Sequence, residues 1–317
     1  MLILDNHFDE YIKENEKVSL HPNINYDYFP KNLIDLKNII FYGPNGVGKY
    51  TQMLKAIKQY SPSKLKYEKR ITITFNKNNY IFKISDIHFE IDMSLLGCNA
   101  KLLWNEIYTN IIDIVLARRD NKIGIIVCKN FNEIHSELLE IFYSYIQKTI
   151  TTIDIKFILL MNNIGFLPNN IYNNCKLIRI PRPSKKSYGN IIKNKLKPDL
   201  ILEDITNIKN FSLDINLVNQ NKPMCDVIIN SMLNIKDLRY SNFRNDIYNL
   251  FIYNLNVVEC IWYILNRLIG EDHIKDKYII DIYLELIKFL QYYNNNYRPI
   301  YHLENYLLYL IVKIYEI

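Results

Sequence analysis

The stretch from Gly43 to Gln52, GPNGVGKYTQ, holds the residues of this chain whose types and spacing are best suited to chemistry. Gly43, Gly48 and Lys49 have the spacing G-x-x-x-x-G-K, which is typical of a loop that binds phosphates. In such a loop, backbone N–H groups and the positive end of the following helix surround the phosphates, and the lysine reaches the outer ones. The apolar run IIFY precedes the loop and the periodic residues MLKAI follow it. This order of strand, loop and helix predicts a nucleotide-binding ancestry.

Two departures from the usual pattern argue against hydrolysis of the nucleotide. The residue after the lysine normally carries a hydroxyl that ligates Mg²⁺, but here it is Tyr50, and Thr51 is one residue out of register. Hydrolysis also needs an acidic pair at the end of a buried strand, to order the metal and polarise the attacking water. The strand in that place, IGIIVC, is followed by Lys129 and Asn130. We therefore expect a loop that holds ATP or ADP, holds Mg²⁺ poorly and has no catalytic residue.

The elements that must position this loop are strands that alternate with helices. Expected strands lie at 38–42, 71–75, 80–84, 87–91, 123–128, 155–161 and 176–180, and expected helices at 50–60, 101–116 and 133–150. The runs 71–75 and 80–84 alternate in polarity around the turn-like NKNN, which predicts a hairpin beside the main sheet. Helices of this length between apolar strands predict a parallel sheet with crossovers on both faces.

The character of the sequence changes after IPRPSKKS at 180–187, which is a plausible linker. Every later segment has the apolar period of a helix, notably 187–197, 243–269, 277–292 and 300–317. The predicted fold is an α/β domain followed by one or two helical domains. Trp104 and Trp262 lie on apolar stripes and are expected in the core.

Composition sets broader bounds on the function. The 317 residues carry 39 Lys and Arg against 33 Asp and Glu, and this net charge of +6 is too mild to prove nucleic-acid binding. The five cysteines form no CxxC pair, so neither a zinc site nor a disulfide framework is indicated. No apolar run approaches the length of about 18 residues that a membrane helix needs. We expect a soluble, intracellular protein with no membrane partner.

At this point the chain resembles a known family. The order of the elements, the GPNGVGK loop, LLMNN, NNCKLIRIPRPS and the C-terminal PIYHLENYLLYLIVKIY together are similar to a replication factor C small subunit. These are AAA+ clamp-loader subunits that help to place a sliding clamp on primed DNA. The resemblance is closest to the small subunit with a degenerate ATPase site. It implies an AAA+ P-loop domain with a parallel sheet flanked by helices, followed by all-α lid and C-terminal collar domains.

The resemblance assigns roles to individual residues. It makes Asn162 the sensor-1 asparagine, and KDLR at 236–239 resembles the sensor-2 region, which would make Arg239 a contact of the γ-phosphate. It also implies domains at 36–183 for the AAA+ unit, 184–245 for the lid and 246–317 for the collar, while residues 1–35 stay unassigned. The residues that it assigns to the phosphate loop are Gly43, Pro44, Asn45, Gly46, Val47, Gly48, Lys49, Tyr50 and Thr51.

Several family features are missing. The Ser-Arg-Cys motif that supplies an arginine finger to a neighbouring subunit is replaced by Asn173, Asn174 and Cys175. The paired arginines that face the DNA channel align with Tyr143 and Ser144. An asparagine cannot stabilise the spreading phosphoryl charge as a guanidinium does. These departures extend the loss of catalytic groups beyond the loop.

The first hypothesis is therefore a clamp-loader small subunit that binds a nucleotide weakly or structurally and does not hydrolyse it. It would act with other clamp-loader subunits, a sliding clamp and primer–template DNA, in the nucleus or another site of DNA replication such as a viral factory, since the composition would suit a large DNA virus. One alternative is an independent P-loop ATPase, a helicase loader or motor, which would need an acidic residue such as Asp86 or Glu90 near the γ-phosphate. Another is a pseudo-AAA+ scaffold that binds no nucleotide.

Overall fold

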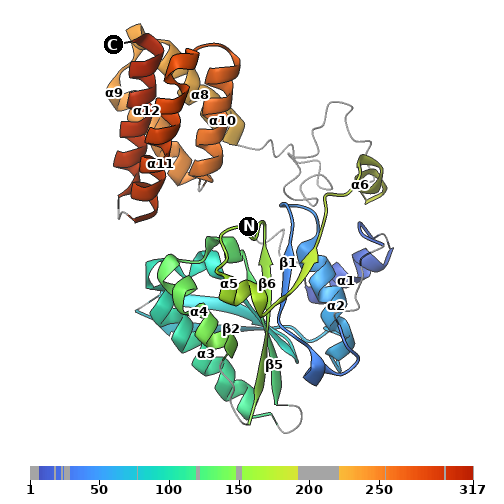
Figure 1. The fold of residues 1–317 in the computed structure, drawn as a ribbon. Coiled ribbons are helices and arrows are strands. Elements are labelled where there is room, and N and C mark those ends of the chain that lie inside the picture. The colour runs from blue at the N-terminus through green and yellow to red at the C-terminus, as the bar shows by residue number, and fades with distance from the viewer. Residues whose placement is uncertain are drawn as a thin grey trace. The chain divides into compact units, whose positions relative to one another are not determined.

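A computed structural model gives the fold of the chain (Figure 1). It describes residues 7–17, 19–22, 24, 29–76, 78–118, 122–147, 152–191, 221–253, 255–295 and 298–316. The chain divides into two compact units, Met1–Ile215 and Asn216–Ile317. No helix in these described ranges is both long enough and apolar enough to cross a membrane.

The first unit is built on a seven-stranded mixed sheet. Five neighbouring strands are parallel, and a hairpin extends the sheet because β3 runs antiparallel to β4 and β2 antiparallel to β3. The predicted parallel sheet with a hairpin at its side is confirmed. In spatial order the strands are β2 (Lys69–Phe75), β3 (Asn78–Ile84), β4 (His88–Asp92), β5 (Ile123–Lys129), β6 (Asp154–Met161), β1 (Ile39–Tyr42) and β7 (Lys176–Arg179).

Both faces of this sheet are covered by helices, which explains why its central strands are apolar throughout. Ile125 and Val127 of β5 pack into a core shared with α1 and α2, whereas Ile126 and Cys128 pack into the core under α3 and α4. Figure 1 shows these two helical layers on either side of the strands. The helices of this unit are α1 (Phe8–Lys17), α2 (Lys49–Ile57), α3 (Ala100–Leu116), α4 (Ser136–Gln147), α5 (Asn169–Asn173) and α6 (Lys185–Ile191).

Helix α1 lies in the segment that the sequence left unassigned. Phe8 and Ile12, four residues apart on one helical face, are buried in the core with α2. The Phe8 N–H donates to the Glu68 carboxylate at 2.9 Å. This helix is therefore an integral layer of the α/β unit.

All regular elements among the described residues of the second unit are helices. The prediction of a single helix at 243–269 is wrong, because one helix ends at Ile252 and the next begins at Val257. The Asn256 side chain caps the new helix by accepting hydrogen bonds from the N–H groups of Val258 and Glu259, at 3.1 and 3.2 Å. The helices are α8 (Asn221–Leu233), α9 (Tyr240–Ile252), α10 (Val257–Gly270), α11 (Ile279–Asn295) and α12 (Pro299–Tyr315).

The two tryptophans differ in burial. Trp104 is fully buried under the sheet, which confirms its predicted place in the core. The prediction for Trp262 is wrong, since 42% of this residue is exposed on α10. Helices α8 and α9 share one core with α10, α11 and α12. Residues 192–220 lie outside the described residues, so the predicted division into a lid and a collar stays a prediction.

Candidate functional site

The phosphate-type loop begins where three parallel strands end at the same edge of the sheet. The Gly43 N–H donates to Met161 O at 3.3 Å, and the Ile180 N–H donates to Tyr42 O at 2.8 Å. A β-carbon at Gly43 would stand 2.1 Å from Ile180 O, so only glycine fits this close approach of two backbones. Gly48, directly before α2, has a φ of +89°, a conformation that also favours glycine.

Lys49 joins the loop to the end of β6. Its Nζ donates to Gly43 O at 2.5 Å, to Pro44 O at 2.8 Å and to Asn162 Oδ1 at 2.9 Å. Burial, with the nearby charge of Arg182, lowers the pKa of Lys49 to about 8. The structure thus brings Asn162 to the loop across more than a hundred residues of sequence. Its role as a sensor stays a prediction.

Tyr50, the residue directly after Lys49, contacts Tyr11 and Lys129. Its ring meets the Tyr11 ring edge-on, with centroids 5.1 Å apart, and the Lys129 Nζ lies 5.6 Å from its centroid. Burial and the nearby charge of the Glu90 carboxylate raise the pKa of Tyr50 well above its ordinary value, so its hydroxyl is protonated.

Glu90 is the centre of a buried charged cluster beside Tyr50. Its carboxylate lies 3.3 Å from His88 Nε2 and 3.5 Å from Lys129 Nζ, and only 2% of the residue is exposed. Burial on its own would raise the pKa of Glu90, but the His88 hydrogen bond and the Lys129 charge bring it below its ordinary value. Glu90 is therefore a buried carboxylate paired with His88 and Lys129, although its Oε2, which faces Lys129, accepts no hydrogen bond from the described residues. Asp86, the other acidic candidate, accepts hydrogen bonds from Ser61 and Ser63.

Lys49, Tyr50, Lys129 and Asn162 line a cavity of about 250 Å³ at the edge of the sheet. Lys49, Lys83 and Lys129 contribute to its wall, against the single carboxylate of Asp92. This excess of positive charge suits an anion. The volume is below that of pockets that enclose whole drug-sized ligands, so the cavity fits a phosphate chain rather than a complete nucleotide.

The donors around this cavity do not fit a magnesium ion. Asp92 accepts hydrogen bonds from Asn130 Nδ2 at 3.0 Å on each oxygen, and its Oδ1 also accepts from the Ser94 N–H. Mg²⁺ needs near-octahedral oxygen ligands, and lysine ammonium groups repel it. Within the described part of the chain, no group of three or more His, Cys, Asp or Glu side chains could hold a metal. The loop itself fits phosphates, since its glycines and Lys49 are in place.

Sequence reasoning missed four residues around the loop. The His21 ring nitrogen Nε2 lies 2.7 Å from Val47 O, and burial lowers the pKa of His21, so the neutral ring donates this hydrogen bond. Tyr11 and Asp92 line the cavity, and Arg182 acts on Lys49 through its charge. Asp92 could have been found, because the carboxyl ends of adjacent parallel strands meet at one edge. The apolar spacing in the segment FDEYI would have indicated α1 and thereby Tyr11.

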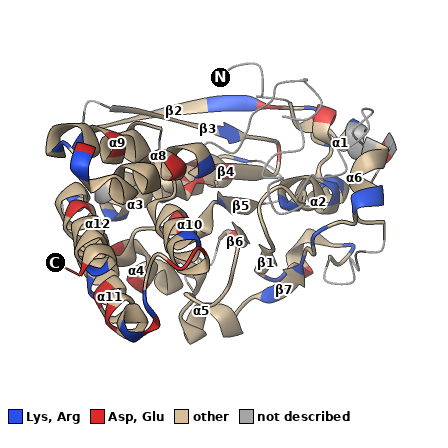
Figure 2. Cartoon of the chain, turned by 90° about the horizontal axis from the view of Figure 1, so that it is seen from above, with Lys and Arg blue, Asp and Glu red and all other residues tan. Residues whose placement is uncertain are grey.

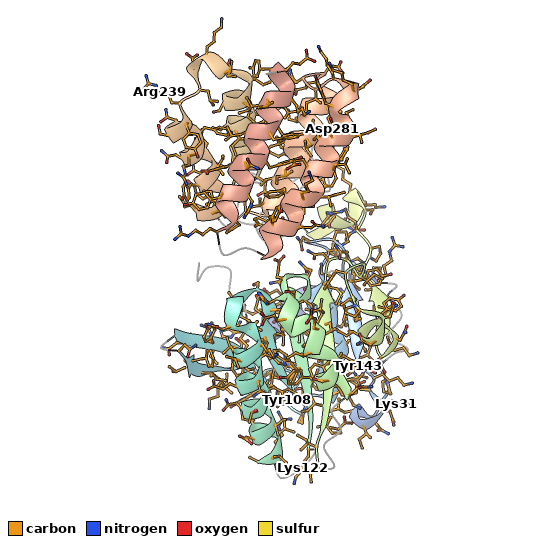
Figure 3. All side chains as sticks on the ribbon, turned by 60° about the vertical axis from the view of Figure 1, so that its left-hand side comes forward. Lys31, Tyr108, Lys122, Tyr143, Arg239 and Asp281 are labelled. Carbon is orange, nitrogen blue, oxygen red and sulfur yellow. The ribbon has the colours of Figure 1, made fainter. Side chains whose placement is uncertain are left out.

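Other predicted positions are not among the residues that line the cavity. Arg239 is exposed at the start of α9 in the helical unit, and Figure 3 shows it at that unit's surface. Its contact with a γ-phosphate depends on how the units assemble and stays a prediction. Asn173 and Asn174 stand at the end of α5, and the Asn174 side chain donates to Asn170 O. Tyr143 lies on α4 (Figure 3).

The chain was compared with known proteins. No protein-family model matches it. It is 25% identical over 202 residues to replication factor C subunit 5 of Saccharomyces cerevisiae, across 58% of this chain and 57% of that relative. It therefore spans little more than half the length of this relative. The predicted resemblance to replication factor C is confirmed at this level, whereas the closer match to a degenerate subunit stays a prediction.

Among solved structures the chain is similar to two variants of the RuvB protein of Thermotoga maritima. The first is 14% identical with a TM-score of 0.36, over 72% of this chain and 68% of that one. The second is 14% identical with a TM-score of 0.34, over 75% and 73%.

Proposed function

We propose that this chain is a small subunit of a replication factor C-like clamp loader and holds a nucleotide without hydrolysing it. One observation carries the proposal. The Lys49 ammonium is held by the loop carbonyls and Asn162, which supports a phosphate site, while Lys129 at the end of β5 takes the place where an ATPase needs a carboxylate and pairs with the buried Glu90 of β4. In this proposal the site keeps its phosphate-holding residues and lacks a water-activating carboxylate at the end of β5.

The partners are part of the proposal. The sequence similarity to a replication factor C subunit supports assembly with other clamp-loader subunits, with a sliding clamp and, through the assembly, with primer–template DNA at a site of DNA replication. Figure 2 shows Lys and Arg on β2, β3, α2 and β7, whereas the helices of the second unit carry both signs. This chain's own share of the grip on DNA is proposed to be small, since its net charge is only +6.

Nucleotide titration tests the binding part of this proposal. We expect ADP and ATP to bind the purified chain, and Lys49→Ala to weaken binding at least about tenfold, because a charged hydrogen bond is lost. Lys66→Ala, at an exposed lysine outside the cavity, is the matched control and should leave the affinity unchanged. Steady ATP turnover by the isolated wild-type chain would contradict the non-hydrolysing role.

Purification with native partners tests the assembly. Recovery of other AAA+ subunits and a ring-shaped clamp is the expected result. Recovery of the chain alone, or with a helicase, would favour the independent ATPase, a helicase loader or motor. Failure of any nucleotide to bind, with partners still recovered, would favour the scaffold that binds no nucleotide. The three hypotheses thus give three different combinations of results.

A further inference from the structure

Tyr50, Glu90 and Lys129 form a cluster beside the cavity that the loop lysine lines. Tyr50 directly follows Lys49, and its ring contacts the Tyr11 ring and the Lys129 ammonium. The Glu90 carboxylate lies 3.5 Å from that ammonium, and the Glu90 side chain is only 1% exposed. The Lys129 side chain is 32% exposed and lines the cavity. A fixed positive charge therefore faces the same cavity as Lys49.

This charge stands where a phosphate-binding loop ordinarily relies on a metal. In such loops the hydroxyl after the lysine and a carboxylate from the neighbouring strand hold Mg²⁺ against the outer phosphates. Here the hydroxyl position carries Tyr50, and the strand end carries Lys129 and Asn130. The one carboxylate in the wall, Asp92, is hydrogen-bonded to Asn130.

We propose that the Lys129 ammonium replaces the metal ion, so that the cavity takes the phosphate chain of a nucleoside diphosphate or triphosphate in its magnesium-free form. This rests on the proposed nucleotide-holding function and specifies its ligand. Lys49 and Lys129 bind the phosphates from two sides, and Glu90 positions Lys129 from the buried side. Mg²⁺ in solution competes with the protein for the same phosphate oxygens.

Titration calorimetry of the full chain with ADP and ATP, in EDTA and then with excess Mg²⁺, tests this directly. We expect binding in EDTA and equal or weaker binding once Mg²⁺ is added. Binding that is at least about tenfold tighter with Mg²⁺ would overturn the inference. If the variant Asp92→Asn then lost that tightening, Asp92 would be identified as the metal-holding residue instead.

Two lysines at either end of strand β5 provide a matched pair of variants. Lys129→Met should weaken ADP binding in EDTA by roughly tenfold to a hundredfold, because a charged hydrogen bond to phosphate is lost. Lys122→Met, at an exposed lysine that does not line the cavity, should change it by less than about threefold. Equal effects of the two variants would contradict a specific role for Lys129.

A double variant distinguishes a loss of nucleotide binding from a loss of folding. Lys129→Met alone leaves Glu90 buried without its cation, whereas Lys129→Met with Glu90→Gln removes both charges together. The double variant should fold and show the same weak binding. Wild-type affinity in that folded variant would overturn the inference.

Failure of this inference is distinguishable from failure of the proposed function. Nucleotide binding that requires Mg²⁺ contradicts only the metal-free ligand. Absence of binding in both conditions contradicts nucleotide holding itself and the inference with it.

Discussion

At the scale of single residues, Lys49 shows how the fold prepares a phosphate site. Its ammonium is held by two loop carbonyls and by Asn162, in surroundings that lower its pKa to about 8. A bound phosphate would stabilise the charged form and raise that pKa again. Binding and protonation of Lys49 are therefore linked.

This linkage predicts a pH dependence with a defined sign. Below about pH 8 Lys49 is already protonated, so its contribution to affinity is constant, whereas above that value binding must take up a proton. Affinity for ADP should fall by up to about tenfold per pH unit between about pH 8 and about pH 10. Calorimetry in two buffers of different ionisation enthalpy measures the proton uptake. Lys49→Arg, which stays charged, is the control and should bind with no such slope.

The close approach at Gly43 gives a second prediction for a single residue. In Gly43→Ala the added β-carbon would meet Ile180 O at 2.1 Å, and a backbone atom between two paired strands cannot move aside cheaply. We expect a loss of about 1 to 3 kcal/mol in the free energy of unfolding, measured in urea. Gly165→Ala, where nothing lies within 4 Å, should stay within about 0.5 kcal/mol of the wild type.

At the scale of elements, α10 begins with a side-chain cap that α9 and α12 lack. Asn256→Ala should lower the stability of the helical unit by about 1 kcal/mol, because two N–H groups lose their acceptor. The measurement is denaturant unfolding followed by helical circular dichroism. Asn99 precedes α3 without a side-chain cap, so Asn99→Ala should change stability by only a few tenths of a kcal/mol. Equal losses in both variants would contradict the capping argument.

Several of these elements could be predicted from the sequence, and the exceptions have physical causes. The apolar run of β5 requires burial on both faces, and that requirement alone indicates a central parallel strand. The break before α10 was missed because apolar residues keep a helical period across it, although Asn256 is a recognisable cap. Periodicity predicts which residues share one face of a helix, but it does not specify whether another helix covers that face, so the exposure of Trp262 could not be predicted. The Lys129–Glu90 contact joins two strands and needs their register, Glu90 beside Val127.

At the scale of the whole molecule, the chain is two units with separate cores. The helical unit buries Leu265, Leu268, Leu303, Leu307 and Leu310 almost completely among its own helices. A fragment spanning Asn216–Ile317 should therefore fold by itself. We expect a helical circular dichroism spectrum and a single cooperative unfolding transition. A broad, non-cooperative loss of helix would show that this unit needs the rest of the chain.

The Glu90 cluster also bears on how such a site could change during evolution. A first step back toward an acidic strand end, Lys129→Asp, would set a second carboxylate against the buried Glu90 and remove its cation. A first step at the loop, Tyr50→Ser, would leave a void beside Tyr11. Each single substitution is expected to give a less stable protein. Because Lys129 contacts both Glu90 and the Tyr50 ring, a change at position 129 is expected to be tolerated best when positions 50 and 90 change with it.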